Sequence, residues 1–72
     1  MPAPRSLLPQ TARVRHLRVS KALSQRELAR ICGLSPTTVN RVESGLPTSL
    51  STIHALALAL DVEPLEISRV DA

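Results

Sequence analysis

The sequence contains no phenylalanine, tyrosine or tryptophan, and this absence limits both its core and its functions. The core of this 72-residue chain has to be built from leucine, valine, isoleucine and alanine. A chain of this length forms one small domain with a modest core. Proteins that bind single-stranded nucleic acids stack the bases on aromatic side chains, so that class of function is disfavoured.

Cysteine, histidine and glycine are also scarce. Cys32 is the only cysteine, so no disulfide can form within the chain, and we expect this residue to be a small buried one. Together with Cys32, His16 and His54 are too few and too scattered for a zinc site. The only glycines are Gly33 and Gly45, which excludes a glycine-rich phosphate loop. We find no set of nucleophile, base and acid, and therefore predict no metal, no cofactor and no enzymatic activity.

Long apolar runs are missing as well. The first residues lack the apolar core of a signal peptide, and no run approaches the length needed to cross a membrane. We therefore expect a soluble, cytoplasmic protein without a membrane partner.

Basic and acidic residues are present but unevenly placed. Residues 1–41 hold eight of the nine lysines and arginines and one acidic residue, whereas residues 42–72 hold one arginine and five acidic residues. This asymmetry indicates a molecule with one side that faces a polyanion.

Periodicity and capping residues predict a helical domain at residues 11–70, preceded by an arm at 1–10. The arm contains three prolines and no helical period, so we expect it to be mobile. Apolar spacing predicts five helices, at about 11–19, 25–32, 36–44, 52–60 and 64–68. We expect Thr11 and Ser51 to cap the first and the fourth.

The most informative stretch is 24–45. Ser24 and Glu27 form a capping box at the start of one helix, and Gly33 is suited to its end. Ser35 followed by Pro36 then supplies a cap and a first-turn proline for the next helix. Two short helices around one tight turn make a helix-turn-helix, which places its second helix in the major groove of DNA.

These residues resemble the Cro/C1-type (XRE-like) helix-turn-helix family of phage repressors and bacterial regulators. The matching positions are Leu23, Ser24, Gln25, Leu28, Ala29, Gly33, Ser35, Val39, Glu43, Gly45, Leu56, Ala57, Ala59, Leu60 and Val62. The resemblance implies an all-α, five-helix, lambda-repressor-like DNA-binding domain in a bacterial or phage-encoded protein. Three departures concern Pro36, where some relatives carry a base-reading glutamine, Ala22, which replaces a frequent glycine, and the loop 46–49, which lacks the usual lysine or arginine.

By this resemblance, the helix at about 36–44 is the recognition helix. Arg41 can place two donors on guanine, and Thr37 can offer its hydroxyl or its methyl group to a base. Asn40 either pairs with adenine or holds a phosphate, and Thr38 is expected to contact a phosphate. The remaining predicted phosphate contacts are Gln25, Lys21, Arg26, Thr48 and Ser49. An arginine and a glutamate at the positions of Arg18 and Glu43 form a structural ion pair in the family.

The sequence thus predicts a sequence-specific regulator of double-stranded DNA, most simply a repressor that binds a palindromic operator as a homodimer. The predicted dimer seam consists of Leu58, Leu65, Ile67 and Val70, although Leu65 could instead complete the monomer core. One alternative is an antitoxin-like or other module whose main partner is a protein such as a toxin. Another is a stand-alone version of a larger regulator that lacks its sensing domain.

Overall fold

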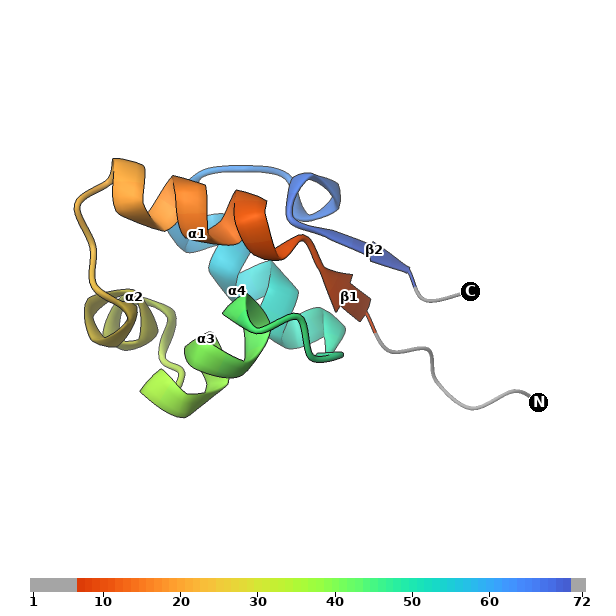
Figure 1. Ribbon diagram of the computed structural model, residues 1–72, viewed down its shortest axis with the longest axis horizontal. Helices are drawn as coiled ribbons and strands as arrows, with labels where there is room; N and C mark the ends of the chain where they lie inside the picture. The colour runs from red at the N-terminus through yellow and green to blue at the C-terminus, as the bar shows by residue number, and fades with distance from the viewer. Residues whose placement is uncertain (1–6, 71–72) are drawn as a thin grey trace.

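The computed structural model describes residues 7–70, which form a small helical bundle closed by two short strands (Figure 1). Four α-helices carry the fold: α1 (Thr11–Ser20), α2 (Gln25–Cys32), α3 (Pro36–Glu43) and α4 (Leu50–Leu60). A 3-10 helix, η1 (Pro64–Glu66), follows, and the strands are β1 (Leu7–Pro9) and β2 (Ser68–Val70). Within this part of the chain, no helix has both the length and the apolar character needed to span a bilayer.

The turn between α2 and α3 forms as its residues predict. The side chain of Ser24 accepts a hydrogen bond from the backbone N–H of Glu27, whose carboxylate accepts one from the N–H of Ser24. Gly33 ends α2 with a φ of 72°, a conformation that costs glycine little. Ser35 caps α3 by accepting a bond from the N–H of Thr38. These caps set where the two helices begin and end.

Other predicted boundaries were wrong. The N-cap of α4 is Ser49 instead of Ser51, because the Ser49 hydroxyl accepts the bond from the N–H of Thr52. Gln10, not Thr11, precedes the first turn of α1. The predicted fifth helix is only the 3-10 turn η1, so the described residues contain four α-helices. The core packing of Ile67 and the start of β2 directly after it leave no room for a longer helix.

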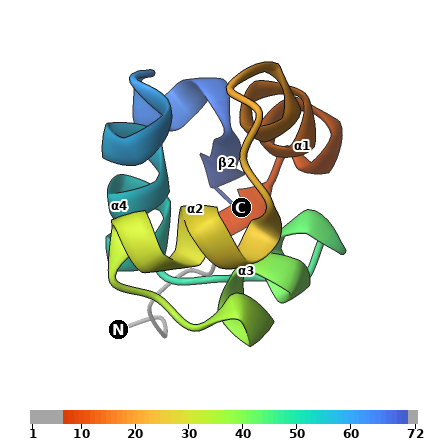
Figure 2. The same cartoon turned by 90° about the vertical axis from the view of Figure 1, so that its left-hand side faces the viewer.

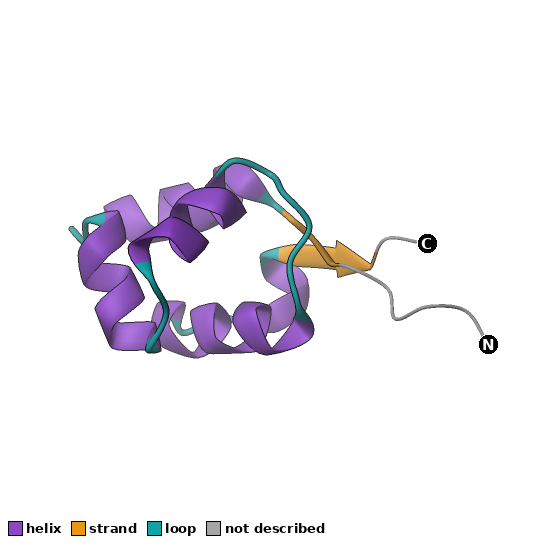
Figure 3. Ribbon diagram, turned by 90° about the horizontal axis from the view of Figure 1, so that it is seen from below, coloured by secondary structure: helices purple, strands orange, loops and turns teal. Residues whose placement is uncertain are grey.

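Part of the predicted mobile arm is also ordered into a strand. β1 pairs with β2 in antiparallel register, with Leu8 opposite Arg69, and the N–H of Gln10 donates to the carbonyl oxygen of Ile67 at 2.8 Å. The pair lies at one end of the molecule (Figure 3). Periodicity within residues 1–10 could not reveal this, because the pairing partner lies at the other end of the chain. The rest of the predicted arm, residues 1–6, lies outside the described residues.

One core joins all four helices. Figure 2 shows α2 and α3 crossing next to each other, with α1 and α4 beside them. The small side chain of Ala29 lies in this core. The buried apolar residues are Val14, Leu28, Ala29, Val39, Val42, Ile53, Leu56, Ala57, Leu60 and Ile67. Cys32 packs against the edge of this core and is half-buried, so it is less buried than the sequence predicted.

The connection between α1 and α2 contains a strained residue. Ala22 has a φ of 57°, a left-handed conformation that costs a residue with a Cβ about 1–2 kcal/mol. This is the position at which the family often carries glycine, so alanine accepts strain there that glycine would avoid.

We predict that Ala22→Gly stabilises the protein by about 0.5–1 kcal/mol. The relief of the left-handed strain exceeds the entropy that glycine adds to the unfolded chain. Urea unfolding measures the change. Ala12→Gly is the matched control, because Ala12 is exposed in α1 and its replacement should destabilise by about 0.5 kcal/mol. Equal destabilisation by both variants would contradict the prediction.

Candidate nucleic-acid interface

Helix α3 has one buried and one exposed side. Val39 and Val42 lie in the core, whereas Thr37, Asn40 and Arg41 are exposed to solvent. Because neighbouring positions on a helix surface are three or four residues apart, Thr37 lies one turn from both Asn40 and Arg41. The three side chains predicted to read bases therefore occupy one polar ridge on the outside of the molecule.

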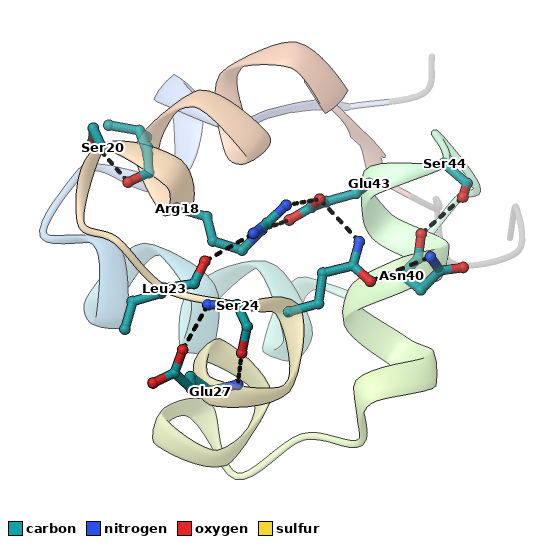
Figure 4. A network of polar contacts seen from close by, with 10 residues as sticks. Arg18, Ser20, Leu23, Ser24, Glu27, Asn40, Glu43 and Ser44 are labelled. Atoms are coloured by element: carbon teal, nitrogen blue, oxygen red, sulfur yellow. Dashed lines mark hydrogen bonds and ion pairs between the residues drawn. The ribbon is translucent and has the colours of Figure 1, made fainter.

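An ion pair between Arg18 and Glu43 ties α1 to the end of α3 (Figure 4). The Nε of Arg18 donates to the Glu43 Oε2 at 2.6 Å, and its Nη2 donates to Oε1 at 3.0 Å. A third N–H, on Nη1, reaches the carbonyl oxygen of Leu23 at 2.8 Å, just before α2. The side chains are 12% and 4% exposed, so water screens the pair weakly. One guanidinium thus holds three helices in place.

The environment of Glu43 favours its ionised form. Burial alone would raise its pKa, but hydrogen bonds from Arg18 and Gln25 and the positive charges of Arg18 and Arg15 outweigh burial. The pKa of Glu43 therefore lies below its ordinary value of 4.5. The carboxylate is charged at neutral pH and can only accept hydrogen bonds.

The amide of Gln25 extends this network to the surface. Its Nε2 donates to the Oε1 of Glu43 at 3.0 Å, and its Oε1 accepts a bond from the Nδ2 of Asn40 at 3.3 Å. The structure thus brings together three predicted functional groups: Gln25, Asn40 and the ion pair. Gln25 is half-buried at the start of α2, and Asn40 is exposed.

The remaining predicted phosphate contacts are distributed around the ridge. Thr38 and Thr48 are half-buried and line, with Arg41, a hollow of about 260 Å³ between α3 and the following loop. Ser49 caps α4, and its hydroxyl also bonds to Ser51 and Thr52.

Lys21 and Arg26 are exposed near the connection between α1 and α2. The structure adds Arg15, which the sequence analysis did not select. It lines a second hollow together with Gln25 and Asn40, and only its position one turn before Arg18 in the sequence could have suggested this.

We predict that Glu43→Gln destabilises the protein by about 3 kcal/mol, because it leaves the mostly buried guanidinium of Arg18 without its charge partner. Folding lowers the pKa of Glu43, so its carboxylate stabilises the fold above the unfolded pKa and loses this contribution as the pH falls through the folded pKa. The wild type should therefore lose stability below about pH 5, and the variant less steeply.

Thermal unfolding between neutral and acid pH measures both effects. Arg13→Gln is the control, because it breaks only the exposed pair of Arg13 with Glu66, which is 3.8 Å long. This control should change stability by about 0.5 kcal/mol or less. An unchanged melting temperature in Glu43→Gln would show that the ion pair does not hold the helices together.

Comparison with known proteins agrees with this geometry. The family model for the helix-turn-helix HTH_3 matches residues 14–67. A search of curated proteins gives no significant match. Among solved structures, the restriction-modification controller protein C.AhdI from Aeromonas hydrophila shares 47% identity, covers 78% of this chain and 86% of its own, and superposes with a TM-score of 0.73.

Two further structures are similar. The hypothetical transcription factor NHTF from Neisseria is 37% identical over 92% of this chain and 81% of its own, with a TM-score of 0.68. The clp gene regulator ClgR from C. glutamicum is 26% identical over 79% of this chain and 75% of its own, with a TM-score of 0.69. The chain belongs to the Cro/C1-type (XRE-like) helix-turn-helix family of DNA-binding transcription regulators.

Proposed function

We propose that this protein is a sequence-specific regulator that binds double-stranded DNA in the bacterial cytoplasm, acts as a repressor, and recognises a palindromic operator as a homodimer. The observation that carries the proposal is the exposed polar ridge of α3, whose opposite side is anchored in the core and by the ion pair of Glu43. A rigid helix of this kind can enter the major groove without first being ordered.

The residues of the ridge have different roles. Arg41 is exposed and can place two parallel donors on the O6 and N7 atoms of guanine. Thr37 lies one turn earlier and can reach a base edge or the methyl group of thymine. Pro36, in the first turn of α3, has no side-chain amide that could bind a base. Sequence recognition would therefore depend on fewer side chains than in relatives that carry a glutamine at this position. Thr38, Thr48 and Ser49 flank the ridge as neutral phosphate ligands.

The charge distribution also supports an orientation in which α3 faces the DNA. Lys21 lies on the connection between α1 and α2 and Arg26 in the first turn of α2, whereas Asp61, Glu63 and Glu66 lie beyond the end of α4. A basic side attracts the DNA backbone, and an acidic side is repelled by it. The molecule would therefore approach DNA with α2 and α3 in front and with the end of α4 pointing away.

The region around the end of α4, which would point away from the DNA, is also the proposed dimer surface. Leu58 and Leu65 are 71% and 75% exposed, so Leu65 does not complete the monomer core as the sequence allowed. Ile67 is fully buried and cannot be part of a seam, which corrects that prediction. The side chain of Val70 lies outside the described residues. Leu58 lies near the end of α4 and Leu65 in η1, so a dimer formed through these leucines would leave both recognition helices free to bind.

The 47% identity to C.AhdI favours a narrower candidate function, the control of a restriction-modification system. The two chains align over most of their lengths, so a common mode of regulation is the simplest expectation. Selection of bound sites from a random duplex pool would give the operator. An operator located beside restriction and modification genes would support this role. An operator found only elsewhere would rule the role out.

We predict that Arg41→Ala weakens binding to the selected operator by about 1–3 kcal/mol and leaves binding to random duplex nearly unchanged. The lost donors read a base edge, which random DNA offers only by chance. Fluorescence anisotropy with both duplexes measures the difference. Arg30→Ala is the matched control, because Arg30 is an exposed arginine at the end of α2 and is not on the ridge. Equal losses on operator and random DNA would show that Arg41 contacts only the backbone.

We also predict that the free protein is a dimer and that Leu58→Asp or Leu65→Asp makes it a monomer. Both side chains are exposed in the single chain, so the charge should cost little folding stability. Sedimentation equilibrium gives the mass, and circular dichroism confirms the fold. Leu50→Asp is the control, since Leu50 is 67% exposed at the other end of α4. A monomeric wild type at high micromolar concentration would contradict the dimer proposal.

A further inference from the structure

An exposed leucine lies on the surface beside the recognition helix. Leu46, in the loop that follows α3, is 44% exposed and lines the hollow of about 260 Å³ between α3 and this loop. The residues around the hollow are Thr38, Arg41, Val42, Leu46, Pro47 and Thr48. Relatives usually carry a lysine or an arginine in this loop, but a leucine has no charge with which to bind a phosphate. A contact made by Leu46 beside Arg41 therefore has to be apolar.

The turn after α3 fixes the position of Leu46. Its backbone N–H donates to the carbonyl oxygen of Arg41 at 3.2 Å, and the N–H of Gly45 donates to that of Val42 at 3.0 Å. With the φ of 86° at Gly45, these bonds form a Schellman motif. In this motif, a residue at the position of Leu46 commonly packs on the residue at the position of Arg41. The leucine is thus tied to the residue that carries the guanidinium.

Packing against α1 adds to this constraint. A Cβ atom on Gly45 would lie 3.3 Å from the Oγ1 of Thr11, so the turn lies close against the start of α1. The loop that carries Leu46 is therefore supported from two sides, by the end of α3 and by α1. An apolar side chain held in this way can make a contact of defined geometry.

The hollow combines two kinds of contact that suit a base pair. Arg41 offers guanidinium donors, and the stem of its side chain is apolar. Leu46 and Pro47 are exposed, and their side chains contain neither donors nor acceptors. In the major groove, the apolar group that a base pair presents is the C5 methyl group of thymine. An apolar surface beside a guanine-binding arginine is therefore suited to a pyrimidine with a methyl group at C5.

We propose that Leu46, together with the stem of Arg41, binds the C5 methyl group of a pyrimidine next to the guanine that Arg41 contacts. The inference rests on the proposed function, since it assumes that α3 lies in the major groove. Thr37, whose own methyl group is a separate candidate for thymine, does not line this hollow. An apolar contact responds to the methyl group and not to the rest of the base, so thymine and 5-methylcytosine both fit, whereas uracil and unmodified cytosine do not.

The first experiment changes only the DNA. Each thymine of the selected operator half-site is replaced in turn by deoxyuridine, which lacks the C5 methyl group and still pairs with adenine. Fluorescence anisotropy should show a position at which the wild type loses affinity about fourfold, the loss expected when one methyl group is no longer buried.

Protein variants assign this loss to Leu46. We expect Leu46→Ala to bind the thymine and deoxyuridine operators equally, because the surface that covers the methyl group is gone. Leu46→Met keeps an apolar side chain of similar size and should retain the discrimination. Leu50→Ala is the matched control, since Leu50 is also exposed but does not line the hollow, and it should discriminate as the wild type does. Circular dichroism checks the fold of each variant.

A second experiment tests whether the methyl group alone is sensed. The T·A pair at the sensitive position is replaced by C·G, with the cytosine either unmodified or methylated at C5. We expect the wild type to bind the methylated duplex about fourfold more tightly than the unmodified one. Leu46→Ala should bind both duplexes equally. Equal binding of both by the wild type would contradict a contact with the methyl group.

The outcomes separate this inference from the proposed function. A wild type that does not bind duplex DNA in a salt-dependent way would overturn the proposed function itself. A wild type that binds its operator, but has no position sensitive to deoxyuridine, would overturn only the methyl contact. The same holds for a half-site without thymine. A sensitive position that persists in Leu46→Ala and disappears in Thr37→Ala would assign the methyl group to Thr37 and overturn the role of Leu46.

Discussion

The bond between Arg18 and Glu43 is the interaction on which the rest of this structure depends. A chain of 72 residues without aromatic side chains has little apolar area with which to hold helices at a fixed angle. Here one guanidinium binds the end of α3 through the carboxylate of Glu43 and the start of α2 through the carbonyl oxygen of Leu23. Because the pair is mostly buried, its geometry is specific in a way that apolar packing alone is not.

This constraint joins the core to the surface. Glu43 lies at the buried end of α3, and the amide of Gln25 carries its orientation outward to Asn40. The helix proposed to face DNA is thus held on one side by Val39 and Val42 and at its end by the ion pair of Glu43. A structure of this kind can present donors to a phosphate and to base edges in fixed positions, which a small and flexible domain could not do. Under the proposed function, stability and recognition would therefore depend on the same few residues.

Much of the fold could be predicted from local chemistry. The capping box at Ser24 and Glu27 and the positive φ of Gly33 are properties of short segments, and they gave the helix-turn-helix and its family. The boundaries that were wrong depend on distant partners. The strand at Leu7–Pro9 exists only because Ser68–Val70 lies beside it, and the predicted last helix is shortened because Ile67 packs in the core. No periodicity within either segment contains that information.

In the candidate site, too, some features could be predicted from the sequence and others depend on the tertiary structure. The sequence by itself determined which residues face outward on α3, because the spacing of Val39 and Val42 leaves Thr37, Asn40 and Arg41 on the other side. Only the tertiary structure decided that Arg15 lies near Gln25 and Asn40, since these three residues come from three different helices. The direction of the amide groups was also decided there, because it follows from a buried charge pair that joins residues far apart in the chain.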